Sequence, residues 1–461
     1  MTRTVTRAYK FRLYPTARQH VLLSSMLAAH CELYNAALQE RRDAYRTRGI
    51  SVSATEQMAQ LTAIRQVRPD QAIWSFTSQQ QTLRRLNKAF QSFFRRVKTG
   101  EAPGYPRFRS VSRFDSVDFR HGDGIKFDPT VRLRRSGRRT EARVRVQGIG
   151  TIRVNLHRHL PDSPIGQVTI KREGIGNQTR WFVVLPLTVD AVKLPPTGAI
   201  VGLDMATGDN GLAYTSDGQC IDNPQFLKRN AAKLANAQRE LAAKKRGSTR
   251  RKHAIAKVAR LHGKVRRSRL DHHHKVTAKL IADHDLIAVE GLNITNMTSR
   301  AKPMPDPDNT GQYLPNGAAA KTGLNKSITD SGWGIFLNLL TAKAESAGRN
   351  VTVVNPRNTS RTCYACGHID VGNRNGKRFT CLTCGHHDDA DINAAKNILR
   401  AGLALHESAT AANAKKPPPS RGGEITMETI SALADAIIDA GWKSPESIEQ
   451  AKTTDERNSA A

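Results

Sequence analysis

The sequence lacks long apolar segments and is poor in cysteine. Its longest apolar run spans residues 181–187, which is far shorter than the ~20 residues of a membrane-spanning helix. The first residues contain no apolar stretch of the signal-peptide type. Six cysteines among 461 residues are too few for a disulfide-stabilised scaffold. We therefore predict a cytoplasmic protein that does not enter a membrane.

Acidic residues are also scarce. The chain has 40 Asp and Glu against 72 Lys and Arg, which gives a net charge of +32 with histidine neutral. The imbalance is greatest in residues 226–280, where 18 Lys and Arg stand against Glu240 and Asp271 alone. A segment this basic would repel itself without a counter-anion. The expected partner is therefore a polyanion, and nucleic acid is the commonest one.

The N-terminal two fifths of the chain combine strand and helix patterns. Alternating apolar residues from Val5 to Leu13 predict a strand, and Thr16 is a plausible N-cap for the helix that follows. A second helix is predicted around residues 79–97, with an apolar stripe for core packing and arginines beside it as candidate contacts. Strand-like segments from about 117 to 189 predict a small antiparallel barrel or sandwich that includes the N-terminal strand.

After a linker at 193–197, the pattern becomes that of an α/β domain. Buried strands are predicted at 199–206 and 286–290, and residues 297–319, rich in Pro, Gly and Asn, predict a loop or lid. Further helices are predicted at 226–282, as a basic pair broken near Gly247, and at 324–347 and 392–401.

Four of the six cysteines form a pattern typical of a zinc site. The spacing is Cys363-x2-Cys366-x14-Cys381-x2-Cys384, in which two turns can each present two thiolates to a tetrahedral Zn²⁺. A site closed by four thiolates leaves no open coordination position, so this zinc is predicted to be structural. His386 or His387 as a ligand is the less economical alternative.

Three separate carboxylates form the second chemical pattern. Asp204 and Glu290 end predicted strands, and Asp391 begins the last predicted helix. Three ionised carboxylates cannot lie together without cations, and oxygen ligands favour Mg²⁺ or Mn²⁺. Such a centre would hydrolyse phosphodiesters with two metal ions. The structural alternatives are helix capping by Asp391 and simple solvation of Glu290, and Asp389 is the residue most easily confused with Asp391.

The motifs together resemble the TnpB family, the compact RNA-guided endonucleases of bacterial and archaeal insertion sequences, and their descendants, the small type V CRISPR effectors. The resemblance covers roughly residues 5–402 and depends on segments such as YKFRLYPTARQ, GLDMATGDNGLAYTSDG, IAVEGLNI and CLTCGHHDDADINAAKNIL. It implies a protein that binds a guide RNA, recognises a short flanking motif in double-stranded DNA, and pairs the guide with the target strand. It also implies Mg²⁺-dependent DNA cleavage, and a bacterial protein that associates with the nucleoid when bound to DNA.

The resemblance further implies a domain order and a set of site residues. The expected domains are a wedge-like β-barrel (1–14 and 101–196), a helical recognition lobe (15–100), a ribonuclease H-like (RuvC) nuclease domain (197–362), a zinc ribbon (363–384), a last RuvC segment (385–402) and a mostly disordered tail (403–461). Asp204, Glu290 and Asp391 would be the catalytic acids that bind magnesium. The cations expected to contact nucleic acid are Arg84, Arg85, Lys88, Arg95, Arg96, Arg134, Arg250, Arg251, Arg266, Arg267 and Arg269.

Several alternatives stay open at the level of sequence. Transposon and CRISPR origins cannot be separated, nor can a monomer from a homodimer. An RNA-guided repressor that binds DNA without cleaving it is disfavoured because all three carboxylates are present. A strand-joining transposase is disfavoured because the pair His157 and His159 has no convincing tyrosine partner. The run His272-His273-His274 on a basic helix is predicted to be polar or phosphate-facing rather than metal-binding.

Overall fold

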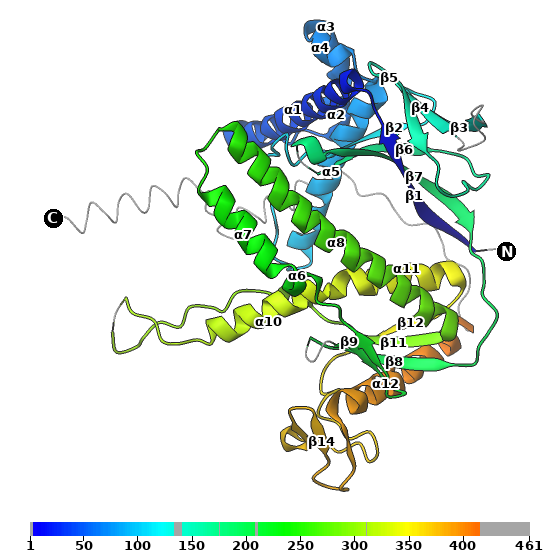
Figure 1. Ribbon diagram of the computed structural model, residues 1–461, viewed down its shortest axis with the longest axis vertical. Coiled ribbons are helices and arrows are strands. Elements are labelled where there is room, and N and C mark those ends of the chain that lie inside the picture. The colour runs from blue at the N-terminus through cyan, green and yellow to red at the C-terminus, as the bar shows by residue number, and fades with distance from the viewer. Residues whose placement is uncertain (1–2, 133–140, 175, 208–210, 310, 415–461) are drawn as a thin grey trace. The chain divides into compact units, whose positions relative to one another are not determined.

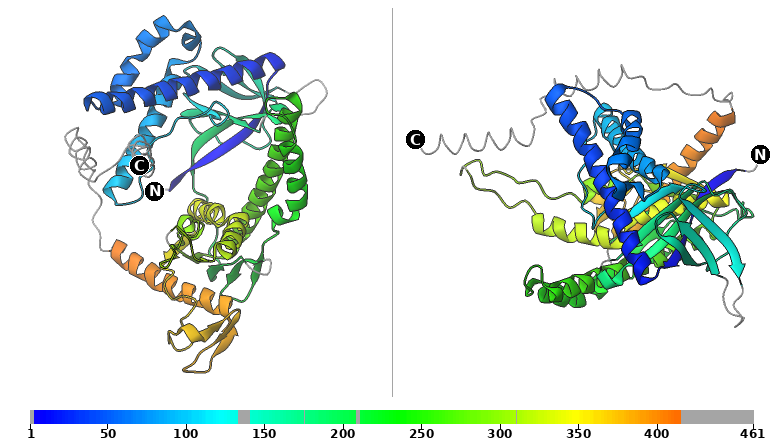
Figure 2. Two further views of the ribbon diagram at one scale, coloured as in Figure 1. Left: turned by 90° about the vertical axis from the view of Figure 1, so that its left-hand side faces the viewer. Right: turned by 90° about the horizontal axis from the view of Figure 1, so that it is seen from above.

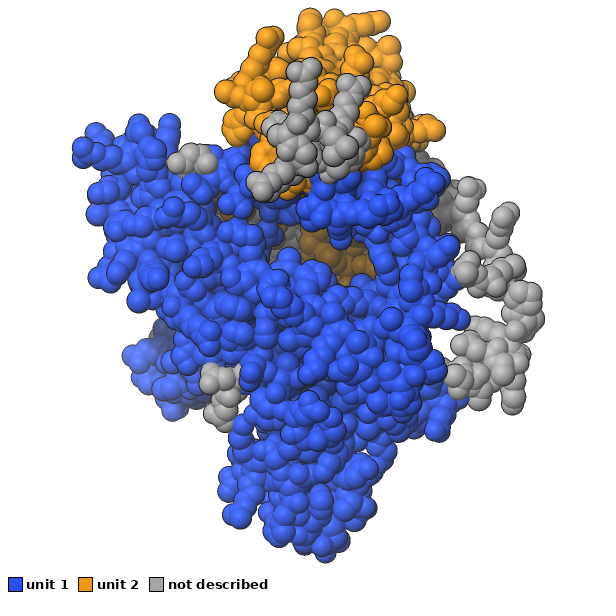
Figure 3. All heavy atoms as spheres, turned by 45° about the vertical axis from the view of Figure 1, so that its right-hand side comes forward, with its two compact units in different colours: residues 1–13, 156–166, 172–416 blue, residues 14–155, 167–171, 417–461 orange. Residues whose placement is uncertain are grey.

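A computed structural model describes residues 3–132, 141–174, 176–207, 211–309 and 311–414. The chain divides into two compact units, which Figure 3 shows in different colours. The first consists of residues 1–13, 156–166 and 172–416, and the second of residues 14–155, 167–171 and 417–461. Arg134 and most of the predicted tail lie outside the described residues.

Seven strands form one sheet in the order β2-β6-β7-β1-β5-β4-β3 (Figure 1). The β1–β7, β2–β6, β3–β4 and β4–β5 pairs are antiparallel. β2 and β3 are its two edges, so the predicted barrel is an open half-barrel. The strands are β1 (Thr4–Tyr14), β2 (Ser116–Arg120), β3 (Ile125–Arg132), β4 (Glu141–Val146), β5 (Gly150–Asn155), β6 (Gln167–Glu173) and β7 (Arg180–Asp190), with a short 3-10 helix at Gly176–Gln178.

The N-terminal strand has the predicted alternation. Side chains of a strand point alternately to opposite faces, and in β1 the residues Val5, Tyr9, Phe11 and Leu13 are buried. Phe11 lies opposite Val183 in the register with β7, whose own alternate residues are also buried. One face of these two strands therefore forms an apolar core.

The helical region of the second unit begins at the predicted cap. The hydroxyl of Thr16 accepts a hydrogen bond from the backbone N–H of Gln19, and the side chain of Gln19 accepts one from the N–H of Thr16, which is a capping box. In α5, Leu83, Leu86 and Phe90 are buried, which confirms the core role of the stripe at these positions. The helices are α1 (Ala17–Arg48), α2 (Ala54–Ala59), α3 (Leu61–Val67), α4 (Pro69–Ala72) and α5 (Phe76–Lys98).

Among the described helices, α1 alone is long and apolar enough to cross a membrane by length and composition. However, 56 % of its most apolar segment is buried inside the protein, and α1 contacts α5. Leu27 and Leu38, for example, are almost fully buried. Much of this apolar surface is therefore used for packing, as in the core helix of a folded unit.

The first unit contains a mixed five-stranded sheet in the order β10-β9-β8-β11-β12. β8, β11 and β12 are parallel, whereas β9 is antiparallel to both β8 and β10. The strands are β8 (Ile200–Met205), β9 (Gly211–Thr215), β10 (Cys220–Asp222), β11 (Leu286–Glu290) and β12 (Asn350–Val354).

Helices cover both faces of this sheet. Val201 and Leu203 of β8 join a core cluster with Leu280 of α8 and Phe336 of α11, whereas Ala288 of β11 packs with Ile398 of α12 on the other face. The helices of this unit are α6 (Phe226–Arg229), α7 (Ala231–Ala242), α8 (Thr249–Asp283), α9 (Ile294–Met297), α10 (Ala318–Ser331), α11 (Trp333–Ala347) and α12 (Ala390–Ala414).

Two helix predictions need correction. The helix predicted at 324–347 is two helices, because Gly332 adopts the left-handed conformation with φ 69° that ends α10 and begins α11. The last helix, predicted at 392–401, runs from Ala390 to Ala414. The segment after 402 is rich in alanine, which is the strongest helix former but resembles low-complexity sequence when read alone.

The cysteine-rich segment is a small ribbon at the N-terminal end of α12 (Figure 2). It contains a three-stranded sheet in the order β13-β14-β15. Its elements are η2 (Val371–Asn373), β13 (Arg374–Asn375), β14 (Arg378–Thr380) and β15 (His387–Asp389).

Candidate functional site

Two of the predicted carboxylates lie near the C-terminal ends of neighbouring parallel strands. β8 and β11 pair with Leu203 opposite Val289, and the next residues along each strand are Asp204 and Glu290. Because side chains alternate along a strand, Asp204 and Glu290 lie on the sheet face opposite to Leu203 and Val289. This is the face covered by α12.

Helix α12 lies very close to this face of the sheet and brings the third carboxylate to the same end of β8 and β11. A Cβ added to Gly202 would be 2.1 Å from the carbonyl oxygen of Ala395, and one added to Gly402 would be 2.4 Å from the Cβ of Ala288. Two glycines, one on the strand and one on the helix, therefore allow this approach. Asp391 lies in the first turn of α12, at the end of the helix nearest the carboxylates.

The three carboxylates form one electrostatic group. Burial, together with the charges of Glu290 and Asp391, raises the pKa of Asp204 to about 8, although Arg374 opposes the shift. Burial also raises the pKa of Glu290, opposed by a hydrogen bond from the Thr359 hydroxyl to Oε1 of Glu290 at 2.5 Å. An anionic group buried this way needs a proton or a cation to compensate its charge.

Asp389 and Asp391 have different roles. Oδ1 of Asp389 accepts the backbone N–H groups of Asp391 and Ile392 at 2.9 and 3.2 Å, so Asp389 caps the helix. Oδ1 of Asp391 instead accepts a hydrogen bond from Nη2 of Arg374 at 2.7 Å, in an ion pair that is mostly shielded from solvent on the Asp391 side. The capping alternative for Asp391 is therefore wrong.

Arg374 and Thr359 are two contacts of the carboxylate group that the sequence did not predict. Arg374 belongs to the cysteine ribbon, and Thr359 lies in the segment before it. Neither is close in sequence to the acid that it contacts, so no local pattern could have placed it there.

The four cysteines converge as predicted. Their Sγ atoms all lie within 4.8 Å of one another, with Cys363 and Cys384 3.7 Å apart and Cys366 and Cys381 3.6 Å apart. In the described ranges this is the only group of three or more Cys, His, Asp or Glu residues whose ligand atoms are so close. Four thiolates suggest a structural zinc ion, and the carboxylates are more widely spaced.

The two halves of the cysteine cluster have the same backbone geometry. Each reads Cys-x-x-Cys-Gly-His, and in each the glycine N–H donates to the carbonyl of the first cysteine, at 2.9 Å for Gly367 and 3.0 Å for Gly385. Both glycines have a positive φ, 79° and 72°, which a residue with a side chain rarely adopts. In the second half, the backbone N–H of Cys384 lowers the pKa of the Cys381 thiol to about 6, and the thiolate is the form that binds metal.

Three of the predicted nucleic-acid contacts are engaged within the protein. Arg85 forms an ion pair with Asp118 at 2.7 Å, and Arg269 forms one with Asp330 at 2.6 Å. Arg251 donates to two backbone carbonyls at the turn between α7 and α8. Arg266 is largely exposed although it lies 3.3 Å from Glu173, and Arg96 is half-buried. The other predicted cations in the described ranges are exposed, namely Arg84, Lys88, Arg95, Arg250 and Arg267.

The triple-histidine run does not face phosphate as a unit. His273 is 2 % exposed, and its ring packs edge-on against Phe336 with centroids 5.7 Å apart. Burial lowers its pKa to about 4. The prediction of a polar or phosphate-facing role is therefore wrong for His273, because α8 turns this position toward α11.

The chain combines a mixed α/β unit, a four-cysteine ribbon inserted in it, a half-barrel sheet and an N-terminal helical region, which together form a Cas12f-like fold. In agreement, the model of a Cas12f1-like TNB domain matches residues 333–398. The OrfB_IS605 model, described as "Probable transposase", matches residues 183–301, and its helix-turn-helix domain model matches residues 1–49.

Known proteins identify the family. A "Putative RNA-guided DNA endonuclease" of Streptomyces pristinaespiralis is 31 % identical over 411 residues, which is 88 % of this chain and 91 % of the relative. The "Putative RNA-guided DNA endonuclease InsQ" of Escherichia coli K12 is 29 % identical over 87 % of this chain and 93 % of its own length. The fold is similar to that of Cas12f1, solved in complex with sgRNA and target DNA, with a TM-score of 0.54, 12 % identity, and coverage of 86 % of this chain and 98 % of Cas12f1. The chain belongs to the TnpB (OrfB_IS605) family.

Proposed function

We propose that this protein is an RNA-guided DNA endonuclease that hydrolyses phosphodiester bonds at Asp204, Glu290 and Asp391 with Mg²⁺ or Mn²⁺. The observation that carries this proposal is the convergence of the three acids from β8, β11 and α12. Burial of Asp204, with the charges of the other two acids, raises its pKa to about 8. Strongly perturbed carboxylates of this kind are typical of functional sites. Two family relatives named as RNA-guided DNA endonucleases support the same conclusion.

The topology supports a ribonuclease H-like (RuvC) assignment. In the five-stranded sheet, β9 and β10 continue antiparallel from β8, and β11 and β12 follow in parallel on its other side. In this assignment the acids of β8 and β11 share the C-terminal end of two neighbouring inner strands, and α12 adds the third acid. We assign the nuclease domain to residues 197–362 and 385–402, with the zinc ribbon at 363–384 between them, and the wedge and recognition lobes to residues 1–196.

The donor set suits a hard divalent cation. All three side chains offer carboxylate oxygens, which are the ligands that Mg²⁺ prefers. When bound, Mg²⁺ would activate the attacking water and stabilise the leaving oxygen. The contribution of the chain is to orient the donors, since Thr359 holds Glu290 and Arg374 holds Asp391. Asp389 fixes the helix end that carries Asp391.

The guide RNA and the target DNA are inferred from the net charge of the chain and from its family. A net charge of +32 favours binding of nucleic acid through its phosphates, with an affinity that falls steeply with salt. In RNA-guided systems base pairing reads the sequence while the protein holds the backbone and recognises a short duplex motif. The exposed cations of α5 and α8 are the candidate backbone contacts.

A cleavage assay tests the proposal. The protein is expressed with its flanking DNA, the copurified RNA is sequenced, and plasmids with a matching target are incubated with the complex and Mg²⁺. Wild type should cleave the plasmid, whereas Asp204→Ala should bind it without cleavage. Asp283→Ala removes an exposed carboxylate at the end of α8 and should cleave like wild type.

Equal cleavage by wild type and Asp204→Ala would refute the proposed site. Target binding by wild type without any cleavage would instead support the alternative function, an RNA-guided repressor.

A further inference from the structure

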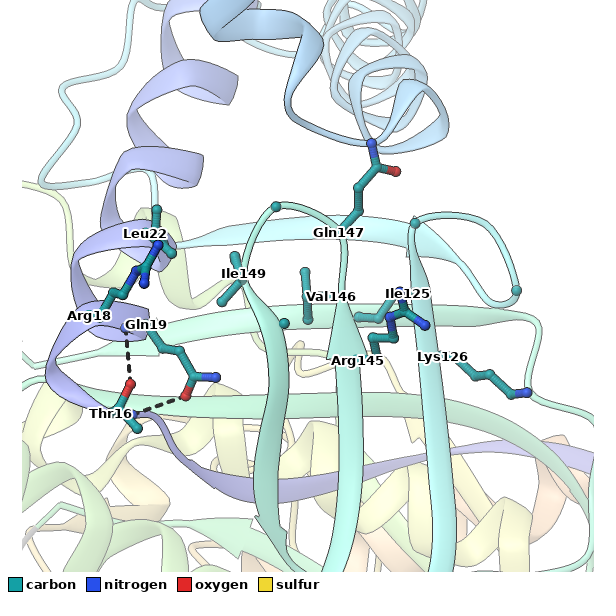
Figure 4. Close-up of a pocket in the computed structure, with 14 residues that line it drawn as sticks. Thr16, Arg18, Gln19, Leu22, Ile125, Lys126, Arg145, Val146, Gln147 and Ile149 are labelled. Atoms are coloured by element: carbon teal, nitrogen blue, oxygen red, sulfur yellow. Dashed lines mark hydrogen bonds between the residues drawn. The ribbon is translucent and has the colours of Figure 1, made fainter.

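The second unit contains a cavity of about 770 Å³ that belongs to neither the carboxylate site nor the cysteine cluster. It lies between the N-terminal turn of α1, the turn from β2 to β3 and the turn from β4 to β5 (Figure 4). Its volume is within the range of pockets that hold small organic ligands, ~300–1,000 Å³. None of the cations predicted from the sequence lines it.

The lining is cationic. Arg18 of α1, Lys126 of β3 and Arg145 of β4 line the cavity, and none of its lining residues is acidic. The three cations are exposed, and no ion pair is recorded for them within the part of the chain that the structure describes. Arg18 is the second residue of α1, where a positive charge opposes the helix dipole. Local helix stability therefore does not explain its position.

The floor of the cavity is apolar and its two turns are rich in glycine. Val146 and Ile149 are buried and line it. Gly122 and Gly150 have φ values of 89° and 92°, and an added Cβ at either would meet no atom closer than 4.0 Å. Backbone without side chains lets a ligand approach the turns closely.

We propose that this cavity binds one nucleotide of a bound nucleic-acid strand. Arg18, Lys126 and Arg145 would hold its phosphate groups, and its sugar and phosphates would approach the glycine turns at Gly122 and Gly150. The cations match phosphate chemistry, and the open glycine turns let the backbone of a nucleic-acid strand approach closely. The inference rests on the proposed function only in that nucleic acid is the partner, and it does not require cleavage. Guide RNA and DNA both contain nucleotides with phosphate groups, so either of them can supply the nucleotide bound in this cavity.

Binding measurements test the proposal in the Asp204→Ala background, so that loss of cleavage cannot affect the result. The charge variant replaces Arg18, Lys126 and Arg145 together with glutamine. The space variant, Leu22→Trp, fills the cavity from α1 without changing charge, since Leu22 also lines it. The control is Arg48→Gln, which removes an exposed arginine at the opposite end of the same helix.

Two labelled probes are titrated by fluorescence anisotropy at several salt concentrations: the RNA that copurifies with the protein, and a short DNA duplex of fixed sequence. For one probe, the charge variant should raise Kd by at least about tenfold and reduce the slope of log K against log salt by about two to three. Leu22→Trp should weaken binding of the same probe but leave the slope of log K against log salt unchanged, because it removes no cation. Arg48→Gln should stay within about twofold of the parent protein.

The two probes distinguish RNA from DNA as the source of the nucleotide. Weaker binding of the RNA probe would show that the cavity holds a nucleotide of the guide RNA. Weaker binding of the duplex would show that it holds a nucleotide of the DNA. If the charge variant behaves like Arg48→Gln for both probes, or if Leu22→Trp leaves both affinities unchanged, the proposal is overturned. Thermal unfolding checks each variant, and the single variant Arg145→Gln, exposed on its strand, replaces the triple variant if that one fails to fold.

Discussion

Replacing Asp204 by asparagine should stabilise the protein while abolishing cleavage. The Asp204 carboxyl has a pKa of about 8 in the folded protein against an ordinary value of 3.8. Between these values the folded state binds more protons than the unfolded state, so this group lowers stability as pH rises from about 4 to 8. Each pH unit costs about 1.4 kcal/mol, which makes ~4 kcal/mol at pH 7. Asparagine has a similar shape but no ionisable group, so the substitution removes this loss of folding stability.

The assay is chemical unfolding of wild type and Asp204→Asn without Mg²⁺ at several pH values from 5 to 7.5. The variant should be the more stable protein, and its advantage should grow by about 1.4 kcal/mol per pH unit. Titrations elsewhere in the chain cancel in this difference. Added Mg²⁺ should stabilise wild type more than the variant, because a ligand that binds only the folded state stabilises it.

The matched control is Asp283→Asn, an exposed carboxylate at the end of α8, whose unfolding should follow wild type at every pH. If wild type and Asp204→Asn show a constant difference in stability from pH 5 to 7.5, the carboxylates do not form the electrostatic group described here, and the argument for a metal centre fails.

Other substitutions test the elements that support this site. Cys363→Ser should lose bound zinc, measured by metal analysis, and lower the thermal midpoint of unfolding, because structural zinc contributes folding free energy directly. Arg374→Gln should raise the pKa of Asp204, since the guanidinium now lowers it, and should therefore shift the pH of half-maximal Mn²⁺ binding upward. Gly202→Ala should destabilise the protein by ~3 kcal/mol or more and reduce cleavage, because its Cβ would meet the backbone of α12.

Matched controls accompany these three variants. Cys220 is exposed and outside the cluster, so Cys220→Ser should retain zinc. Arg378 is an exposed arginine of the same ribbon, so Arg378→Gln should leave the pH of Mn²⁺ binding unchanged. Gly323 is a helical glycine with nothing within 4 Å of an added Cβ, and Gly323→Ala should be neutral or stabilising by up to ~1 kcal/mol. A control that behaves like its partner variant would contradict the corresponding contact.

Some features of the protein could be predicted from sequence because they are local. The capping box at Thr16, the alternation in β1 and the two Cys-x-x-Cys-Gly-His turns each depend on residues a few positions apart. The positions of Asp204 and Glu290 at the ends of strands could also be predicted, because short apolar runs indicate buried strands. The motif resemblance added the family, which the relatives confirm.

Long-range packing decided the rest. Only the fold shows that Gly202 lets α12 lie on β8, and only this approach brings Asp391 into the carboxylate group. Likewise Arg85 and Arg269 looked like free surface cations in the sequence, but they pair with acids from distant segments. The cavity beside Arg18 depends on two turns more than a hundred residues further along the chain. Patterns a few residues long specify turns, caps and strands, whereas charge pairing, burial and cavities depend on which distant segments meet, and that is fixed only when the whole chain packs.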